Sequence, residues 1–208
     1  MSGVRNAGVP VILRVLPSAL QRSFFARPTL EVARDLVGAL LIRQLPDARA
    51  VVRVVEVEAY LGPADPASHA FRRTRRSEVM WGPPGTAYVY FSYGNHFCLN
   101  VVTEREGTAG AVLLRAGQPL AGLEVMVRLR GTTEVHQLCS GPGRLTQALA
   151  IDGSFNRADL TRRGALYLAR GTPPHRVATS PRIGIRRAAD RPWRFFDPDS
   201  PFVSRRRT

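Results

Sequence analysis

The segment that most constrains the fold is the valine-rich run Ala50–Tyr60, whose length and composition predict a long β-strand. Alternation of side chains predicts one face that is made of Val52, Val54, Glu56, Glu58 and Tyr60. Two interpretations of the carboxylates stay open. They form a solvated acidic edge, or one of them lies at the margin of the buried valines, where desolvation suits a general base.

Apolar runs separated by glycine and proline predict the other elements. Helices are expected at Leu30–Leu41 with Thr29 as N-cap, at Leu120–Arg130, and at Pro142–Ala150 with Ser140 as N-cap. Further strands are expected at Thr86–Tyr93, His96–Thr103 and Gly110–Ala116, with a hairpin turn at Tyr93–His96. We therefore predict one α+β domain around a largely antiparallel sheet, spanning residues 23–208 after a loosely ordered arm of residues 1–22.

The 208 residues carry a formal net charge of +14, which favours a polyanionic partner. Charge alone does not distinguish DNA from RNA, a heparin-like polymer or an anionic membrane surface. The chain contains arginine but no lysine, so no side-chain amine is present for imine chemistry. The basic loop Arg72–Arg76 is expected to contact DNA because it follows the Glu58 strand, whereas the run Arg205–Arg207 has only its charge as an argument.

Several classes of site are not expected. The two cysteines, Cys98 and Cys139, belong to no CxxC pair or His/Cys cluster, which argues against zinc and favours free thiols in a reducing compartment. No apolar run is long enough to span a membrane and no signal peptide is evident, so a cytoplasmic location is expected. Without P-loop, GxGxxG, GxSxG or HExxH motifs, nucleotide binding, serine hydrolysis and zinc proteolysis have no support.

The expected hairpin carries three tyrosines. Tyr88 and Tyr90 share one face, which strand packing alone would explain. Tyr93 at the tip has little to pack against, so beside a basic surface it is a candidate wedge between stacked bases. At Ser140–Arg144 the free amides of a helix start suit a phosphate, although a capped surface helix explains the same residues.

Six segments carry a resemblance that runs from about Phe24 to about Ser204; they are Val55–Gly62, Ala67–His69, Gly85–Gly94, Phe97–Val101, Val112–Ala116 and Leu138–Pro142. In this order they resemble those of the alkyladenine (3-methyladenine) DNA glycosylase family. The resemblance implies a curved sheet with peripheral helices and a protruding hairpin that inserts into DNA. It also implies a monomer without cofactor or metal that flips alkylated or deaminated purines from duplex DNA and hydrolyses their bond to the sugar.

The same resemblance implies the site. Glu58 is implied as the general base that deprotonates a water, and Arg115 and the backbone carbonyl of Ile183 as groups that hold this water. The implied pocket residues are Tyr60, His69, Tyr90 and Asn100. The asparagine would collide with the 2-amino group of guanine, and Tyr93 would fill the gap left in the duplex. The implied phosphate contacts are Thr74, Arg76 and Arg144.

Two positions depart from the family's pattern: Asn95 stands where Met is common, and Thr74-Arg75-Arg76 stands where Thr-Pro-Arg is expected. A catalytically silent nucleic-acid binder and a glycosylase acting on RNA stay open as alternatives. The enzyme is favoured because a silent binder should have lost Glu58, Arg115 or a stacking tyrosine. The absence of lysine further predicts a monofunctional enzyme that uses water as nucleophile and leaves the strand intact.

Overall fold

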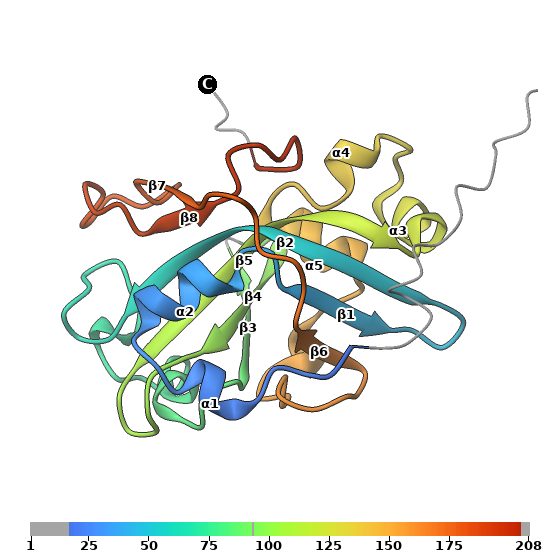
Figure 1. Cartoon of the computed structure of the whole chain (residues 1–208). Helices are drawn as coiled ribbons and strands as arrows, with labels where there is room; N and C mark the ends of the chain where they lie inside the picture. The colour runs from blue at the N-terminus through green and yellow to red at the C-terminus, as the bar shows by residue number, and fades with distance from the viewer. Residues whose placement is uncertain (1–16, 93, 205–208) are drawn as a thin grey trace, which may run out of the picture.

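An eight-stranded antiparallel sheet is the frame of the structure, a computed structural model that describes residues 17–92 and 94–204 (Figure 1). The strands are β1 (Leu40–Gln44), β2 (Arg49–Leu61), β3 (Ala87–Ser92), β4 (His96–Val102), β5 (Gly110–Ala121), β6 (Leu166–Ala169), β7 (Ala178–Ser180) and β8 (Arg194–Phe196). Their order is β3-β4-β5-β2-β1-β6, and β8 pairs with both β2 and β7. These antiparallel pairings confirm the predicted α+β class.

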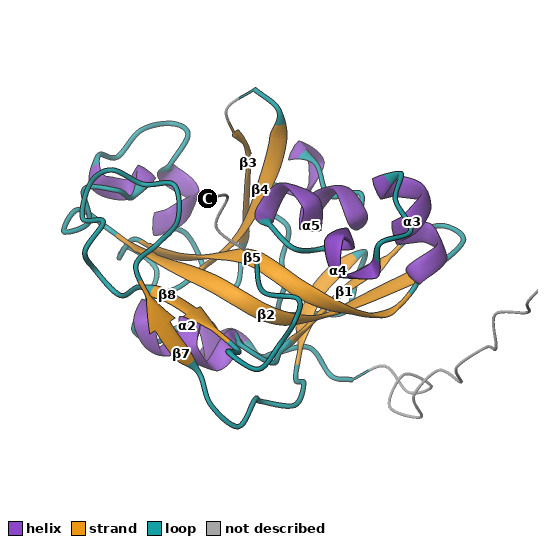
Figure 2. Cartoon of the chain, turned by 90° about the horizontal axis from the view of Figure 1, so that it is seen from above, coloured by secondary structure: helices purple, strands orange, loops and turns teal. Residues whose placement is uncertain are grey.

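Short helices surround the sheet. They are α1 (Arg22–Phe25), α2 (Thr29–Leu36), α3 (Leu123–Arg130), α4 (Val135–Leu138) and α5 (Pro142–Ala148). Figure 2 shows α3, α4 and α5 grouped together, with α2 apart from them and near β7 and β8. Helices α2 and α5 both bury apolar side chains in the main core, which explains why such short helices are stable here. Within the described residues, no helix is long and apolar enough to cross a membrane.

Strand β2 is divided by a β-bulge at Val55. One edge of β2 pairs first with β1 and then, beyond the bulge, with β8, whereas β5 pairs along the other edge. Val54 pairs with Gly117 and Glu56 with Ala116, so Val55 is an extra residue without a partner on β5. An extra residue reverses the alternation of faces in the strand that follows it.

The bulge overturns the predicted faces of this strand. Val52 and Val54 pack in the main core, but after the bulge it is Val57 and Ala59 that pack there. Glu58 therefore lies on the opposite face from the two valines with which simple alternation grouped it. That prediction was wrong because alternation takes no account of an inserted residue.

The predicted helix Leu30–Leu41 is too long at its C-terminal end. Helix α2 ends at Leu36, and Leu40 already belongs to β1. Between them Gly38 has a φ of +98°, a conformation that ends the helix and returns the chain to the sheet. Thr29 is not the N-cap: it is the first helical residue, and its hydroxyl bonds to Thr103 and Glu104 instead.

Other element boundaries and caps also differ from the predictions, and α5 ends at Ala148 rather than Ala150. Strand β5 continues to Ala121, so α3 begins at Leu123 rather than Leu120, although it does end before Gly131 as predicted. Ser140 does not cap α5: its hydroxyl accepts a hydrogen bond from Arg144, and no side chain caps this helix. The extended pairing of β5 with β2 explains the first difference, because it extends β5 over residues with helical periodicity.

The predicted N-terminal arm lies partly outside the described residues, which begin at residue 17. Within the described part, Ala19 forms a bridge with Ala169 of β6, and Leu20 is buried in the core. The predicted free thiols are confirmed, since Cys98 and Cys139 are both buried and unpaired with each other.

Candidate active site

A cavity of about 370 Å³ lies between the β3–β4 hairpin and the strands β2 and β5. Figure 2 shows this hairpin running away from the long β2–β5 pair. The predicted site residues in the cavity wall are Tyr60, His69, Arg76, Tyr90, Asn100, Arg115 and Ile183. The fold thus brings together seven residues that the resemblance to the glycosylase family had implied as site residues. The volume falls within the range of small-molecule pockets.

Glu58 lies next to the cavity wall, and its side chain is 0% exposed. Its Oε1 accepts a hydrogen bond of 2.7 Å from the backbone amide of Ile183, which is 125 residues away in the chain. Its Oε2 accepts one of 2.9 Å from the Tyr60 hydroxyl and lies 3.3 Å from Nη1 of Arg115. Among the described residues Oε1 has a single donor, so it retains a lone pair for the proton of a water.

Arg115 reaches Glu58 from a second bulge. Glu56 pairs with Ala116 and Val57 with Leu114, so Arg115 is the extra residue on β5. Bulges next to active sites commonly redirect a side chain, and here the guanidinium is directed between Glu58 and Glu56. Burial opposes the charge of Arg115, but both carboxylates outweigh it and raise the pKa of Arg115. The arginine is therefore a permanent cation beside Glu58.

The residue before Ile183 takes part in a buried ion pair that sequence reasoning missed. Arg182 donates to both carboxylate oxygens of Asp65 at 2.6 and 2.9 Å, and both side chains are 0% exposed. Asp65 also accepts hydrogen bonds from the backbone amides of Leu61 and Ala67, and these bonds fix the loop after β2. The two partners are 117 residues apart, so no local pattern in the sequence could have linked them.

Aromatic rings form one wall of the cavity. His69 Nδ1 lies 2.8 Å from the Tyr88 hydroxyl, and the His69 ring meets Tyr90 edge-on with centroids 4.6 Å apart. Tyr88 also lines the cavity, so the packing interpretation of this residue understated its place in the site. Desolvation, and then the charge of Arg76, lowers the pKa of His69 to about 4, so the ring is neutral near pH 7. Burial raises the pKa of Tyr90.

Tyr60 links the cavity to the carboxylate. Its hydroxyl donates to Glu58, and the Arg182 guanidinium lies 4.6 Å from the centroid of its ring. Burial first, and then the charge of Glu58, raises the pKa of Tyr60 well above its ordinary value. Tyr60 therefore remains a hydrogen-bond donor throughout the pH range in which an enzyme works.

Asn100 is buried in the cavity wall at 4% exposure. Its Nδ2 donates to the backbone carbonyl of Tyr88 at 3.0 Å, across the β3–β4 pair. This bond orients the Asn100 side chain within the cavity wall.

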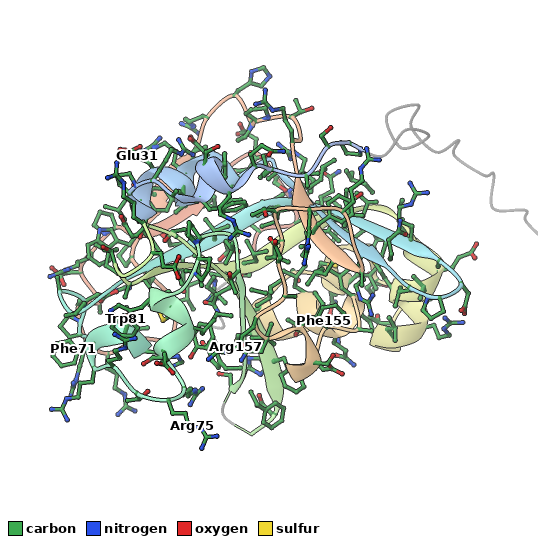
Figure 3. The ribbon with its side chains drawn as sticks, turned by 90° about the horizontal axis from the view of Figure 1, so that it is seen from below. Glu31, Phe71, Arg75, Trp81, Phe155 and Arg157 are labelled. Carbon is green, nitrogen blue, oxygen red and sulfur yellow. The ribbon has the colours of Figure 1, made fainter. Side chains whose placement is uncertain are left out.

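The three predicted phosphate contacts are not gathered in one place. Thr74 is exposed and bonds to Ser77, whereas Arg76 lies over the Tyr90 ring, 4.8 Å from its centroid, in the cavity wall. Arg144 lies in a separate groove next to the cavity and donates to Ser140. Figure 3 shows the side chain of Arg75 pointing away from the body of the protein.

Tyr93, the predicted wedge, lies outside the described residues. The two strands that flank it are described and pair in register from Ala87 with Val101 to Ser92 with His96, which confirms that the two predicted strands are antiparallel neighbours. No group of three His, Cys, Asp or Glu side chains that could hold a metal ion occurs in the described parts of the chain.

Comparison with known proteins agrees with this geometry. The family model described as Methylpurine-DNA glycosylase (MPG) matches residues 23–201. A curated protein of Methanocella arvoryzae is 49% identical over 192 residues, covering 90% of this chain and 96% of its own length. Similar proteins of Carboxydothermus hydrogenoformans and Streptomyces avermitilis are 45% and 47% identical, covering 90% and 89% of this chain and 99% and 90% of their own lengths. All three are named "Putative 3-methyladenine DNA glycosylase".

These matches define the class of protein as a DNA glycosylase, a hydrolase of N-glycosyl bonds that acts in base excision repair. Within that class, the chain belongs to the methylpurine-DNA glycosylase family. The match covers nearly the whole described structure, including every element that contributes to the cavity.

Proposed function

We propose that this protein removes alkylated or deaminated purines, of the 3-methyladenine, 7-methylguanine, hypoxanthine and ethenoadenine class, from duplex DNA. The observation that carries the proposal is the buried Glu58 carboxylate, which accepts two hydrogen bonds and forms an ion pair with Arg115 beside a cavity walled with aromatic rings. A flipped base needs flat stacking faces, and its removal needs a group that activates water. The cavity and the carboxylate supply both.

In this mechanism the bond between the sugar C1′ and the purine nitrogen breaks, and its electron pair goes to the purine. An N-alkylated purine such as 3-methyladenine is cationic and leaves as a neutral base, whereas hypoxanthine or ethenoadenine starts neutral and takes a proton from solvent as it leaves. In each case the sugar develops oxocarbenium character. Glu58 stabilises that positive charge and takes the proton of the attacking water on Oε1, where a lone pair is free. We assign the positioning of this water to Arg115 and the Ile183 carbonyl.

The remaining predicted residues have roles in binding. Tyr60, His69 and Tyr90 would stack on the flipped base, and Asn100 would exclude the 2-amino group of guanine. Tyr93 would fill the space that the base leaves in the duplex. The phosphate contacts would be Thr74, Arg76 and Arg144. The proposal includes a monomer that acts on DNA in the cytoplasm.

The reaction proposed here ends at an abasic site in an intact strand. Strand-cleaving glycosylases attack the sugar with an amine and form an imine, and this chain has no lysine to supply that amine. Arginine does not replace it, because its guanidinium keeps its proton up to a pH of about 12. Borohydride reduction should therefore trap no efficient protein–DNA adduct, and strand cleavage should need added alkali. Efficient trapping would refute a water-only reaction and point to the amine of Met1, or of Ser2 after processing.

The decisive experiment is single-turnover excision by Glu58→Gln on lesion-containing duplexes. The amide matches the carboxylate in shape but does not take a proton, so base release should fall at least about 10²-fold while lesion affinity stays within about tenfold. Glu31→Gln is the matched control, since Glu31 is an exposed carboxylate on α2 (Figure 3). Excision by Glu58→Gln near the wild-type rate would refute the proposed base, and faster excision from RNA than from the matching DNA duplex would refute the DNA substrate.

A further inference from the structure

Glu56 is the second carboxylate of β2 and is as buried as Glu58, with a side chain that is 0% exposed. Isolated buried carboxylates are costly, so Glu56 needs compensating partners. Its Oε1 accepts hydrogen bonds from Arg115 Nε at 2.9 Å, Arg194 Nε at 2.7 Å and the Ser204 hydroxyl at 2.8 Å. Its Oε2 accepts a hydrogen bond of 2.6 Å from the backbone amide of Ser204.

The partners of Glu56 come from three separate parts of the chain: β5, β8 and the segment after β8. Arg194 is held in turn by the Ser180 hydroxyl of β7, and its guanidinium lies 4.3 Å from the centroid of the Phe196 ring. Glu56 is thus held in place by its partners, and the tertiary structure directs two arginines toward it.

Arg115 connects the two carboxylates. It meets Glu56 through Nε at 2.9 Å and Glu58 through Nη1 at the longer distance of 3.3 Å. Two carboxylates and two guanidiniums, those of Arg115 and Arg194, leave this cluster with balanced formal charge. Because Nε of Arg115 is bound to Glu56, only the two Nη groups of this arginine remain for Glu58, and the contact is the longer one through Nη1.

We propose that Glu56 is a positioning residue for the glycosylase reaction: it holds Arg115 by the Nε edge, and its charge keeps Arg115 from neutralising Glu58. This inference rests on the proposed role of Glu58 as the base. Besides Arg115 on β5, the groups that face Glu58 are Tyr60 on its own strand, Cys98 on β4 and the amide of Ile183. Across the β2–β8 pair, Glu58 is in register with Arg194, whose side chain is directed to Glu56.

The test compares two charge changes that should act in opposite directions. Glu56→Gln removes a negative charge near Glu58, so the acid-side half-maximum of single-turnover excision should move to lower pH by about one unit. Arg194→Gln removes a positive charge and should move that half-maximum to higher pH. At the pH of maximal activity Glu56→Gln should excise about 10–100-fold more slowly, with lesion-duplex affinity changed by less than about threefold.

Ser204→Ala is the matched control, because it removes one hydrogen bond to Glu56 and no charge. It should leave the acid-side half-maximum where it is. If Glu56→Gln does not fold, the upward movement in Arg194→Gln still supports the proposal. The proposal is overturned if the two charge variants move the half-maximum in the same direction or not at all, or if Ser204→Ala moves it equally.

Failure of this inference can be told apart from failure of the proposed function. Excision by Glu58→Gln is measured in the same assay. If Glu58→Gln is active, the assignment of Glu58 as the base is refuted, whatever the result for Glu56→Gln. If Glu58→Gln is inactive and Glu56→Gln has the wild-type rate and pH profile, Glu58 keeps its assignment as the base and only the positioning role of Glu56 is refuted.

Discussion

Replacing Asp65 with asparagine should both destabilise the protein and slow its reaction. Asp65 and Arg182 form a bidentate ion pair in which both side chains are 0% exposed. Neutralising one partner leaves the Arg182 charge buried without its counter-ion, at a cost of about 3–5 kcal/mol. A domain of this size loses about 2–4 °C per kcal/mol, so the melting temperature should fall by about 6–20 °C.

The effect on activity follows from the neighbouring residue. Ile183 comes directly after Arg182, and its backbone amide donates a hydrogen bond of 2.7 Å to the Glu58 carboxylate. Loosening Arg182 should let that amide move, so single-turnover excision should slow by about tenfold or more below the unfolding temperature. Circular dichroism melting and excision from a defined lesion duplex measure the two effects separately.

Asp35→Asn is the control for this variant. Asp35 forms an ion pair with Arg27 at 2.8 Å, but the two side chains are 46% and 33% exposed. An exposed pair contributes at most about 1 kcal/mol. An equal melting temperature for the two variants would refute the stability argument. A destabilised Asp65→Asn that still excises at the wild-type rate would show that the ion pair does not position Ile183.

Three further predictions concern the base pocket. Tyr93→Ala should slow excision more for paired than for mismatched lesions, because unstacking costs least at mismatches; equal losses in a paired and mismatched substrate panel would contradict a wedge. Asn100→Gly should raise release of guanine-derived bases relative to adenine-derived ones, and an unchanged ratio would place the selectivity elsewhere. Burial and Arg76 lower the pKa of His69 to about 4, so folding favours the neutral ring. Wild type should therefore lose stability relative to His69→Gln only as pH falls from about 6.5 to about 4, which melting curves at several pH values would check.

Local sequence patterns were sufficient for the parts of the fold that depend on neighbouring residues. The valine-rich run became β2, and the runs expected at Thr86–Tyr93 and His96–Thr103 became the paired strands β3 and β4. The end of α3 before Gly131 was also predictable, because this glycine adopts a φ of +65°. The candidate site residues were found through the order of motifs along the chain, which does not require their spatial arrangement.

Patterns failed where a distant strand changed the outcome. The apolar run after Leu36 has the spacing of a helix, yet pairing with β2 and β6 makes Leu40–Gln44 a strand. Alternation placed Glu58 with Val52 and Val54, but the bulge at Val55 reversed the faces. Both are cases in which hydrogen bonding between segments overrides the local preference of the chain.

The sequence by itself determined which chemical groups this protein has: the two carboxylates of β2, the tyrosines of the hairpin, and arginine as the cation in place of lysine. Only the tertiary structure decided how those groups meet. Bulges at Val55 and Arg115 bring Glu56, Glu58 and the arginine together, and the Asp65–Arg182 pair brings the Ile183 amide to Glu58. These contacts join residues far apart in sequence, and they form because buried charges must find partners once the core has closed around them.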